Sequence, residues 1–342
     1  MKFGRIKVAA GAAAILIILL ALTGYSSIFA MRSGNIEVRV FDVPEGMTLR
    51  WIANSLEDQG IIGNGTLFMI AARVMLSEKD VKAGEYLITP DMSLFDILSS
   101  FRNGRVNYRT VTVLGGYNIS KIGEILEEKG LVDTETFRQL TLRRELIDLL
   151  NLDDDIEDLE GFLYPDTYYF VRGGNPERIV RKMMLRFKEV FGHELEVRAQ
   201  ELGITVKDVV TLASLIEKEA VTDNERPIIS AVFHNRLKRG MPLQSDPTVI
   251  YALGDGFDGD LKRSHLSFKS LYNTYVRRGL PPGPIGSPTI ESIRAALYPA
   301  DVDHLYFVSK NDGTHHFSKN LREHNRAVAI YQKVLALKKV SQ

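Results

Sequence analysis

The chain of 342 residues contains no cysteine, and its 43 basic and 43 acidic side chains balance to a net charge of zero. The absence of cysteine excludes structural disulfides and thiolate chemistry. A balanced charge lacks the basic excess by which nucleic-acid-binding proteins hold phosphates, so no nucleic-acid partner is expected. The sequence also lacks a G-x-S-x-G motif and a phosphate-binding glycine motif, which argues against two common classes of enzyme.

Metal-binding motifs are also missing. His315, His316 and His324 are close in the sequence, but no carboxylate at matching spacing completes a metal site. The acidic run from Asp153 to Asp158 lacks the glycine and the terminal glutamate of an EF-hand loop, and we interpret it as a solvated loop. We therefore predict no metal and no cofactor.

One long apolar segment is present. Residues 8–30 carry no charge and follow the basic start MKFGRIK. About 20 apolar residues span a bilayer core of roughly 30 Å, and basic residues on the N-terminal side keep that end in the cytoplasm. We predict a single-pass anchor in the bacterial cytoplasmic (inner) membrane, with residues 1–7 as a cytoplasmic tail and the rest in the periplasm or outside. A cleaved signal peptide is the alternative, although Ile28 disfavours a cut after Ala30.

A short linker, MRSGN, separates this segment from the first strand-like stretch, so the folded part should act close to the membrane.

An internal repeat follows. EGMTLRWIANSLEDQGII (Glu45–Ile62) aligns without gaps with GGYNISKIGEILEEKGLV (Gly115–Val132). Each copy follows a strand-like stretch and contains a polar N-cap, helical apolar spacing and a final glycine. A looser third unit has a capping box at Ser93 and Asp96. The repeat predicts small α+β modules, which could equally be a packing scaffold.

The stretch TLASLIEKEA belongs to a predicted helix that Thr205 caps. Its apolar residues recur at helical spacing and define one buried stripe: Val206, Val209, Ala213, Ile216 and Ala220. Lys218 points away from this stripe, whereas Glu217 and Glu219 lie on its two edges. Each carboxylate could stand at the lip of a cleft. The alternative is that both form salt bridges to arginines such as Arg226 or Arg236.

Two segments after this helix, NRLKRGMPLQSDPTVIYALG and YNTYVRRGLPPGPIGSP, carry polar side chains between turn residues. Loops rich in proline and glycine are not expected to fill a core. Their amide, hydroxyl and aromatic groups suit a polysaccharide, so the sequence predicts a carbohydrate cleft beside the helix end. The candidate substrate contacts are Glu217, Gln244, Asp246, Asn273 and Tyr275.

The blocks ASLIEKEA, NRLKRGMPLQSDPTVIYALG, YNTYVRRGLPPGPIGSP, AALYPADVDHLYFV and HHFSKNLREHN closely resemble the YceG-like family, the membrane-anchored endolytic murein transglycosylases known as MltG. The resemblance implies an α+β protein with a small LysM-like subdomain at residues 36–104, a larger mixed α/β catalytic domain at residues 105–335 and a C-terminal tail at residues 336–342. It also implies that the second glutamate of the E-K-E motif, Glu219, is the catalytic acid.

The family cleaves the β-1,4 link from N-acetylmuramic acid (MurNAc) to N-acetylglucosamine (GlcNAc) in peptidoglycan, and cell-wall synthases (penicillin-binding proteins) are partners that family membership suggests. One carboxyl group suffices for this reaction if the muramic C6 hydroxyl attacks C1, because no external water is then needed. Glu219 must be protonated near neutral pH, which contact with Leu215 and Ile216 would favour. The alternatives are a conventional muramidase that uses Asp246 as a second carboxylate, a non-catalytic peptidoglycan-binding scaffold and a helix-turn-helix regulator.

Overall fold

The computed structural model describes residues 39–75, 81–89, 92–152 and 155–333. These residues form two compact units. Unit 1 contains residues 39–111 and two short returns of the chain, 129–131 and 169–176, and unit 2 contains the remainder. None of the helices in these ranges is both long and apolar enough to cross a bilayer. The predicted anchor at residues 8–30 lies outside the described residues.

Unit 1 places helices on a two-stranded sheet. Strand β1 (Arg39–Val43) runs antiparallel to β2 (Gly84–Ile88), with Val43 opposite Gly84. The helices are α2 (Leu49–Asp58), α3 (Gly65–Met75) and α4 (Leu94–Asn103). Their buried core gathers around Phe101, whose ring centroid lies 4.6 Å from that of Tyr86 and 6.2 Å from that of Phe68. The α+β class is confirmed here, and the likeness to LysM stays a prediction.

The internal repeat is visible in the backbone. The first glycines of the two copies, Gly46 and Gly116, have φ angles of +82° and +81°, and the closing glycines, Gly60 and Gly130, have +63° and +66°. Glycine adopts such angles more readily than any other residue, because it has no Cβ. Between each pair of glycines lies a ten-residue helix, α2 in the first copy and α5 (Ile119–Glu128) in the second. The predicted repeat is therefore confirmed as a repeated turn and helix.

The predicted capping box is also present. The Ser93 hydroxyl accepts a hydrogen bond from the Asp96 N–H (3.2 Å), and the Asp96 carboxylate accepts one from the Ser93 N–H (2.8 Å). The helix that these residues start, α4, ends at Gly104 in the left-handed conformation. Both ends of α4 are thus fixed by the residue types that the sequence indicates.

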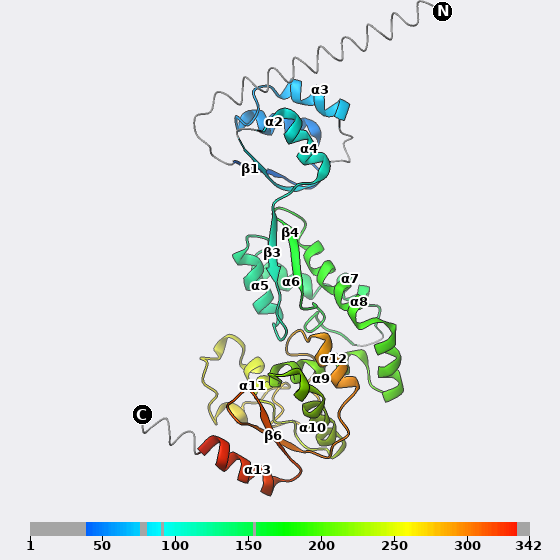
Figure 1. Cartoon of the computed structure of the whole chain (residues 1–342), viewed down its shortest axis with the longest axis vertical. Coiled ribbons are helices and arrows are strands. Elements are labelled where there is room, and N and C mark those ends of the chain that lie inside the picture. The colour runs from blue at the N-terminus through cyan, green and yellow to red at the C-terminus, as the bar shows by residue number, and fades with distance from the viewer. Residues whose placement is uncertain (1–38, 76–80, 90–91, 153–154, 334–342) are drawn as a thin grey trace, which may run out of the picture. The chain divides into compact units, whose positions relative to one another are not determined.

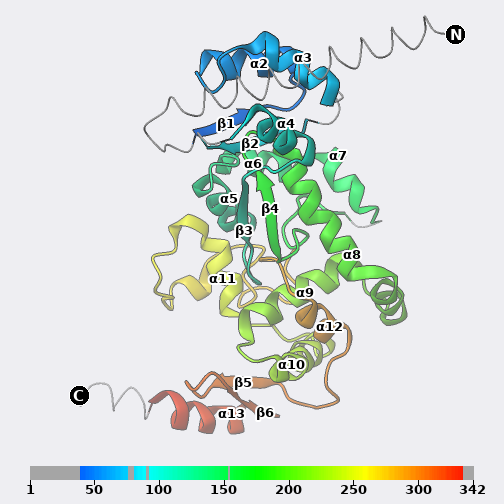
Figure 2. The same ribbon diagram turned by 45° about the horizontal axis from the view of Figure 1, so that its top comes forward.

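Strand β3 (Tyr108–Thr112) pairs with β4 (Thr167–Val171), and each strand has residues in both units: 108–111 and 169–171 in unit 1, and 112 and 167–168 in unit 2. Unit 2 is mainly helical (Figure 1). Its strand β5 (Tyr306–Ser309) runs antiparallel to β6 (His315–Ser318). The helices after α5 are α6 (Thr134–Thr141), α7 (Arg144–Ile147), α8 (Glu177–Leu202), α9 (Val206–Glu219), α10 (Arg226–Lys238), α11 (Asp246–Leu253), α12 (Ile290–Leu297) and α13 (Leu321–Val328). Figure 2 shows α13 next to the β5–β6 hairpin.

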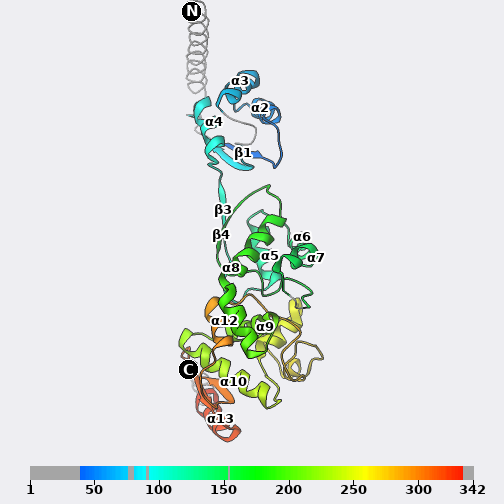
Figure 3. The same cartoon turned by 90° about the vertical axis from the view of Figure 1, so that its right-hand side faces the viewer.

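Helix α9 runs through the centre of unit 2, with α12 packed along it (Figure 3). Thr205 caps the helix as predicted, because its hydroxyl accepts the Asp208 N–H at 3.0 Å. The prediction of a single buried stripe was too narrow, since every residue from Val209 to Ile216 is buried. Helices α8, α10, α11 and α12 all contact α9, so no face of its middle reaches solvent.

The loop PPGPIGSP contradicts the expectation that it cannot fill a core, because residues 283–288 are all buried. Its peptide groups find partners: the Ile285 N–H donates to Ser214 Oγ on α9 (3.1 Å), and the Ser287 N–H donates to the Tyr117 carbonyl (2.8 Å). Gly286 is needed there, since a Cβ would lie 2.6 Å from the Gly116 carbonyl oxygen. A loop can be buried when its backbone is hydrogen bonded in this way.

A buried carboxyl group connects two helices of the unit. Glu160 is 4% exposed and accepts hydrogen bonds from the Ile119 N–H at the start of α5 and from the Tyr251 hydroxyl of α11, each at 3.2 Å. Burial raises its pKa to about 8. The contact holds α11, whose first residues border the candidate site.

Candidate active site

Glu219 is the last residue of α9. The chain leaves the helix at Ala220, which is extended (φ −79°, ψ 129°) although its N–H still donates to the Ile216 carbonyl at 2.9 Å. Glu219 and Glu217 are both partly buried, and Lys218 between them is exposed, as the helical spacing predicts. The two glutamates have different surroundings, which decide what each can do.

Ser245 holds the carboxyl group of Glu219. Its hydroxyl donates a hydrogen bond to Glu219 Oε1 at 2.7 Å, and the residue is only 1% exposed. Ser245 is also the N-cap residue of α11, yet its side chain makes no capping bond. Its own N–H donates to Thr274 Oγ1 at 3.0 Å, and its carbonyl accepts the Thr248 hydroxyl at 2.7 Å. The serine is therefore fixed by its backbone, and its hydroxyl is free to orient the acid.

Burial raises the pKa of Glu219 to about 7 because it penalises the charged form. The negative charge of Asp246 raises the pKa further, whereas the Ser245 hydrogen bond and the positive charge of Arg236 lower it. Across the described residues, Glu219 has no ion-pair partner that would fix it as a carboxylate. A carboxyl group with this pKa can both give and take a proton near neutral pH.

Arg236 of α10 is buried beneath the site and is 7% exposed. Its guanidinium donates from Nε to the Leu305 carbonyl and from Nη1 to the Leu243 carbonyl, both at 2.7 Å, and lies 5.1 Å from the centroid of the Tyr306 ring. Backbone carbonyls thus fix the guanidinium without neutralising it. Its charge favours the carboxylate form of Glu219, although the two side chains form no direct salt bridge.

Asp246 and Tyr275 form a pair at the surface of the site. The Tyr275 hydroxyl donates to Asp246 Oδ1 at 2.5 Å. Asp246 is exposed and follows Ser245 directly, while Tyr275 is partly buried and follows Thr274, which binds the Ser245 N–H. Burial, followed by the nearby Asp246, raises the pKa of Tyr275, so the phenol keeps its proton and remains a donor. The structure therefore brings two of the predicted contacts next to Glu219.

Gln244 and Asn273 occupy different positions. Gln244 is exposed, has a left-handed backbone (φ +49°) and donates its N–H to the Thr274 carbonyl at 3.1 Å. Asn273 is fully buried: its amide donates to the Phe268 carbonyl at 2.7 Å, and its side-chain oxygen accepts the Tyr275 N–H at 2.9 Å. Asn273 organises the loop that carries Tyr275. Substrate contact by either residue stays a prediction.

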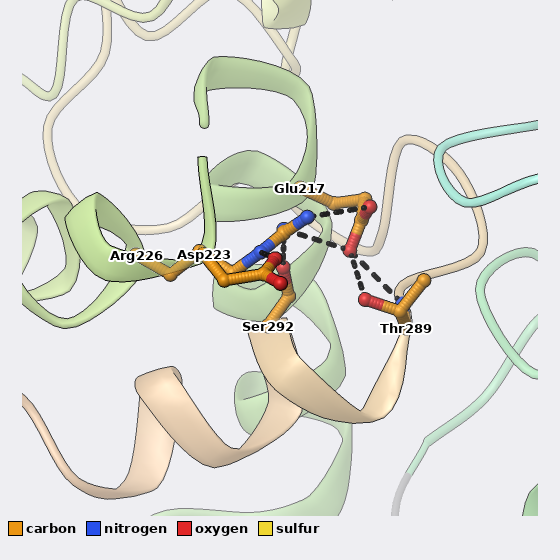
Figure 4. A network of polar contacts seen from close by, with 5 residues as sticks. All are labelled: Glu217, Asp223, Arg226, Thr289 and Ser292. Atoms are coloured by element: carbon orange, nitrogen blue, oxygen red, sulfur yellow. Dashed lines mark hydrogen bonds and ion pairs between the residues drawn. The ribbon is translucent and has the colours of Figure 1, made fainter. Parts of the chain in front are cut away.

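Glu217 is part of a separate ion-pair network (Figure 4). Its Oε2 accepts from Arg226 Nη1 at 3.1 Å and from the Thr289 hydroxyl at 2.7 Å. Arg226 also binds Asp223 and the Ser292 hydroxyl. The side chains of Glu217 and Arg226 are only 7% and 11% exposed. For Glu217 this is the salt-bridged alternative considered from the sequence, and the geometry favours a structural role over the predicted contact with substrate.

Comparison with known proteins assigns the family. The profile of the YceG-like family matches residues 41–330. The chain belongs to the YceG-like family. It is 32% identical over 304 residues to the endolytic murein transglycosylase of Bacillus subtilis, a match that covers 85% of this chain and 84% of that protein. The endolytic murein transglycosylase of Streptococcus pneumoniae is 29% identical over 317 residues, and the match covers 57% of its length.

A solved YceG-like structure, from Listeria monocytogenes, has 30% sequence identity and a TM-score of 0.59 to this chain. The match covers 85% of this chain and 98% of the Listeria chain. The family resemblance that the sequence blocks indicate is thus confirmed, and it extends over most of the chain.

Two residues of this YceG-like site were missed as site residues from the sequence, Ser245 and Arg236. Ser245 stands directly before Asp-Pro at the start of α11, where a serine ordinarily caps the helix. A capping role would therefore explain this serine without any part in the site. Arg236 was named as a possible salt-bridge partner and not as a site residue. The signal that could have found Ser245 is its place between Gln244 and Asp246, which were both selected. No local signal reveals that the Arg236 guanidinium is buried.

Proposed function

We propose that this chain is a lytic transglycosylase that cleaves the MurNAc-β-1,4-GlcNAc bond of peptidoglycan and leaves 1,6-anhydro-MurNAc ends. The relatives named endolytic murein transglycosylases support this activity. The observation that carries the proposal is the partly buried Glu219 carboxyl, which Ser245 holds and whose pKa is raised to about 7. Such a group suits a reaction that needs an acid and then a base at the same place.

In the first step, Glu219 gives its proton to the glycosidic oxygen, and the bond from that oxygen to C1 of MurNAc breaks. The positive charge that develops at C1 is stabilised by the new carboxylate, and the substrate's own acetamido group can assist. In the second step, the C6 hydroxyl of the same sugar attacks C1 while its proton passes to Glu219. The acid is restored and no water is consumed. The tethered hydroxyl has an effective concentration far above that of a free nucleophile.

The neighbouring residues have distinct roles in this scheme. Ser245 donates to Oε1, which leaves Oε2 to carry the proton to the substrate. Arg236 stabilises the carboxylate between the two steps without forming a salt bridge that would trap it. Asp246 and Tyr275 are proposed to position the sugar, and Gln244 to contact it from the exposed rim. Asn273 and Glu217, both predicted to contact substrate, are proposed to act through the loop and the helix end that they hold.

A conventional muramidase is the second candidate, and one observation favours it. Asp246 is an exposed carboxylate in the residue next to Ser245, and its charge acts on Glu219. It could serve as the second carboxylate that ordinary glycosidases require. The Tyr275 hydroxyl donates to one of its oxygens at 2.5 Å, so that oxygen is already occupied. A scaffold without activity would be indicated if the parent chain released no products from glycan strands.

The proposal includes the cellular context. Residues 8–30 would anchor the chain in the cytoplasmic membrane. The short linker after them, MRSGN, would restrict cleavage to newly made glycan strands near the membrane. The enzyme would then terminate the growth of these strands. Penicillin-binding proteins are the proposed partners in this role. The test is to replace MRSGN with a much longer linker and to compare the glycan lengths in cells. An unchanged length distribution would contradict this part of the proposal and leave the chemistry untouched.

The chemistry is tested by digesting purified glycan strands with the full chain and weighing the products. We expect anhydro ends, which are lighter than hydrolysed ends by one water, and no release by Glu219→Gln. Glu217→Gln is the matched control, because it removes the neighbouring charge of the same E-K-E motif. Products that have gained water would favour the muramidase instead.

A further inference from the structure

The segment between α11 and the buried Pro/Gly loop carries three aspartates at its start, Asp255, Asp258 and Asp260, and only basic charges after them. Residues 261–280, LKRSHLSFKSLYNTYVRRGL, contain five lysines and arginines and no aspartate or glutamate, in a chain whose net charge is zero. Lys262 is paired with Asp258 at 2.6 Å. The other four, Arg263, Lys269, Arg277 and Arg278, are exposed, and within the described residues no carboxylate forms an ion pair with them. The positive charges of these four side chains are therefore not neutralised by ion pairs within the part of the chain that the structure describes.

Bulky apolar side chains are exposed in the same segment. Phe268 is 42% exposed, Leu271 56% and Val276 49%. Exposed apolar groups are ordinary when they are scattered, but a group of them ringed by charge marks an interaction surface. We call these three side chains and the four unpaired basic ones the basic-apolar loop.

Asn273 brings the members of this loop together. Its buried amide donates to the carbonyls of Phe268 (2.7 Å) and Leu266 (3.2 Å), and its own carbonyl accepts the N–H groups of Val276 (3.2 Å) and Arg277 (3.1 Å). The exposed side chains on either side of Asn273 are therefore held around one anchored point. Figures 1 and 2 show the chain after α11, in yellow, standing out from the side of unit 2.

We propose that the basic-apolar loop docks on the surface of a lipid bilayer that contains anionic headgroups. The four cations complement the negative surface potential of such a leaflet, and Phe268, Leu271 and Val276 can enter the boundary between headgroups and acyl chains. A soluble polyanion would satisfy the charges but would leave the apolar side chains in water. The combination therefore favours a lipid surface over a phosphate-rich polymer.

This inference goes beyond the proposed chemistry and does not depend on it. Residues 261–280, which carry the basic-apolar loop, also include Thr274 and Tyr275, and these two hold Ser245 and Asp246 in the site. Docking would therefore bring Glu219 close to the membrane surface, and cleavage would fall near the membrane end of a strand. Charge attraction of this kind acts only within about 8 Å at physiological salt.

The test uses the absence of cysteine, because a single introduced thiol can be labelled without background. An environment-sensitive fluorophore is attached to Phe268→Cys or to Leu271→Cys in the full chain, reconstituted in vesicles whose lipids carry a nitroxide quencher on the acyl chain. The matched control is Leu321→Cys, a 54% exposed apolar position at the start of α13. Vesicles of phosphatidylcholine with phosphatidylglycerol are compared with vesicles of phosphatidylcholine alone.

We expect quenching at positions 268 and 271 in the anionic vesicles, little in neutral ones, and none at position 321. Near 1 M salt, where the Debye length falls to about 3 Å, the quenching should be lost. Arg263→Gln with Lys269→Gln should reduce the inserted fraction roughly five-fold per charge, whereas Arg322→Gln with Arg326→Gln on α13 should not.

Equal quenching at all three positions, or none at any, would overturn the proposal. A fluorescence change on adding glycan strands without any response to lipid would also overturn it, and would make the loop a substrate surface. Cleavage of soluble strands in detergent separates this result from the chemistry. The Arg263 and Lys269 variants should retain cleavage, whereas failure of the proposed function would appear in the parent chain itself.

Discussion

The Ser245 hydroxyl donates a hydrogen bond to Glu219 Oε1 at 2.7 Å, although the serine occupies the N-cap position of α11. A serine at this position ordinarily accepts a hydrogen bond from its own helix. Here the hydroxyl instead orients a carboxyl group at the end of another helix. The hydrogen bond links the last residue of α9 to the N-cap residue of α11 and fixes the orientation of the Glu219 carboxyl group.

Glu219→Gln should abolish strand cleavage, with a fall of at least 10²–10⁴-fold, which is the usual range for loss of a general acid. The amide keeps the size of the side chain and can still accept the Ser245 hydrogen bond, so the fold should be unchanged. The measurement is release of products from purified glycan strands, with circular dichroism as the check on folding. Cleavage at the parental rate would transfer the role to another residue.

The pH dependence of cleavage should move in opposite directions in two variants. In the parent, activity should fall tenfold per unit above a pKa of about 7, because Glu219 must begin protonated. Ser245→Ala removes a donor that favours the carboxylate, so the alkaline limb should shift to higher pH. Asp246→Asn removes a negative charge and should shift it to lower pH. Rate profiles that shift in the same direction would contradict these assignments.

Stability should also depend on Glu219 through its proton. Its folded pKa of about 7 lies above the ordinary 4.5, so the folded state binds more protons than the unfolded state between these values. The resulting stabilisation is complete below the ordinary value and is lost as the pH rises through the folded one. Glu219→Gln should therefore be more stable than the parent at pH 8, by about 1–3 kcal/mol, and equal to it at pH 4. Thermal unfolding at both pH values measures this difference.

Glu217→Gln should affect stability more than chemistry. It leaves the Arg226 guanidinium, 11% exposed, without its main partner. Loss of one member of a largely buried pair should cost about 2–4 kcal/mol of unfolding free energy. The double variant Glu217→Gln with Arg226→Gln should recover part of this loss, because no buried unpaired charge remains and the Asp223 carboxylate that also loses Arg226 is 75% exposed. Denaturant unfolding of Glu217→Gln, Arg226→Gln and the double variant tests this, and additive losses would argue against direct coupling.

Local signals in the sequence predicted much of the fold. The Ser93 capping box, the Thr205 cap and the paired glycines of the repeat all adopt the expected geometry, since each depends only on neighbouring residues. The central helix α9 was placed correctly, but its burial on every side was not foreseen. Periodicity reports one apolar face, and it does not report how many elements will pack around a helix.

The sequence could not foresee which of the candidate side chains would lie next to Glu219, because that depends on partners distant in the chain. Glu219, Asp246 and Tyr275 lie together, while Asn273 points into its own loop and Glu217 binds Arg226. The helical positions of Glu217 and Glu219 are nearly equivalent, so only their long-range partners separate them. These partners, Thr289 for one and Ser245 for the other, are distant in sequence and are supplied by the fold.

The most direct test of a single carboxyl group that acts as acid and then base is the origin of the oxygen in the product. Glycan strands are digested by the full chain in heavy-oxygen water, and the new ends are weighed. The account predicts anhydro-MurNAc ends that contain no heavy oxygen, because the C6 hydroxyl of the same sugar closes on C1. Reducing ends that carry one heavy oxygen, produced by the parent chain and lost in Glu219→Gln, would show that water attacks and would contradict the account.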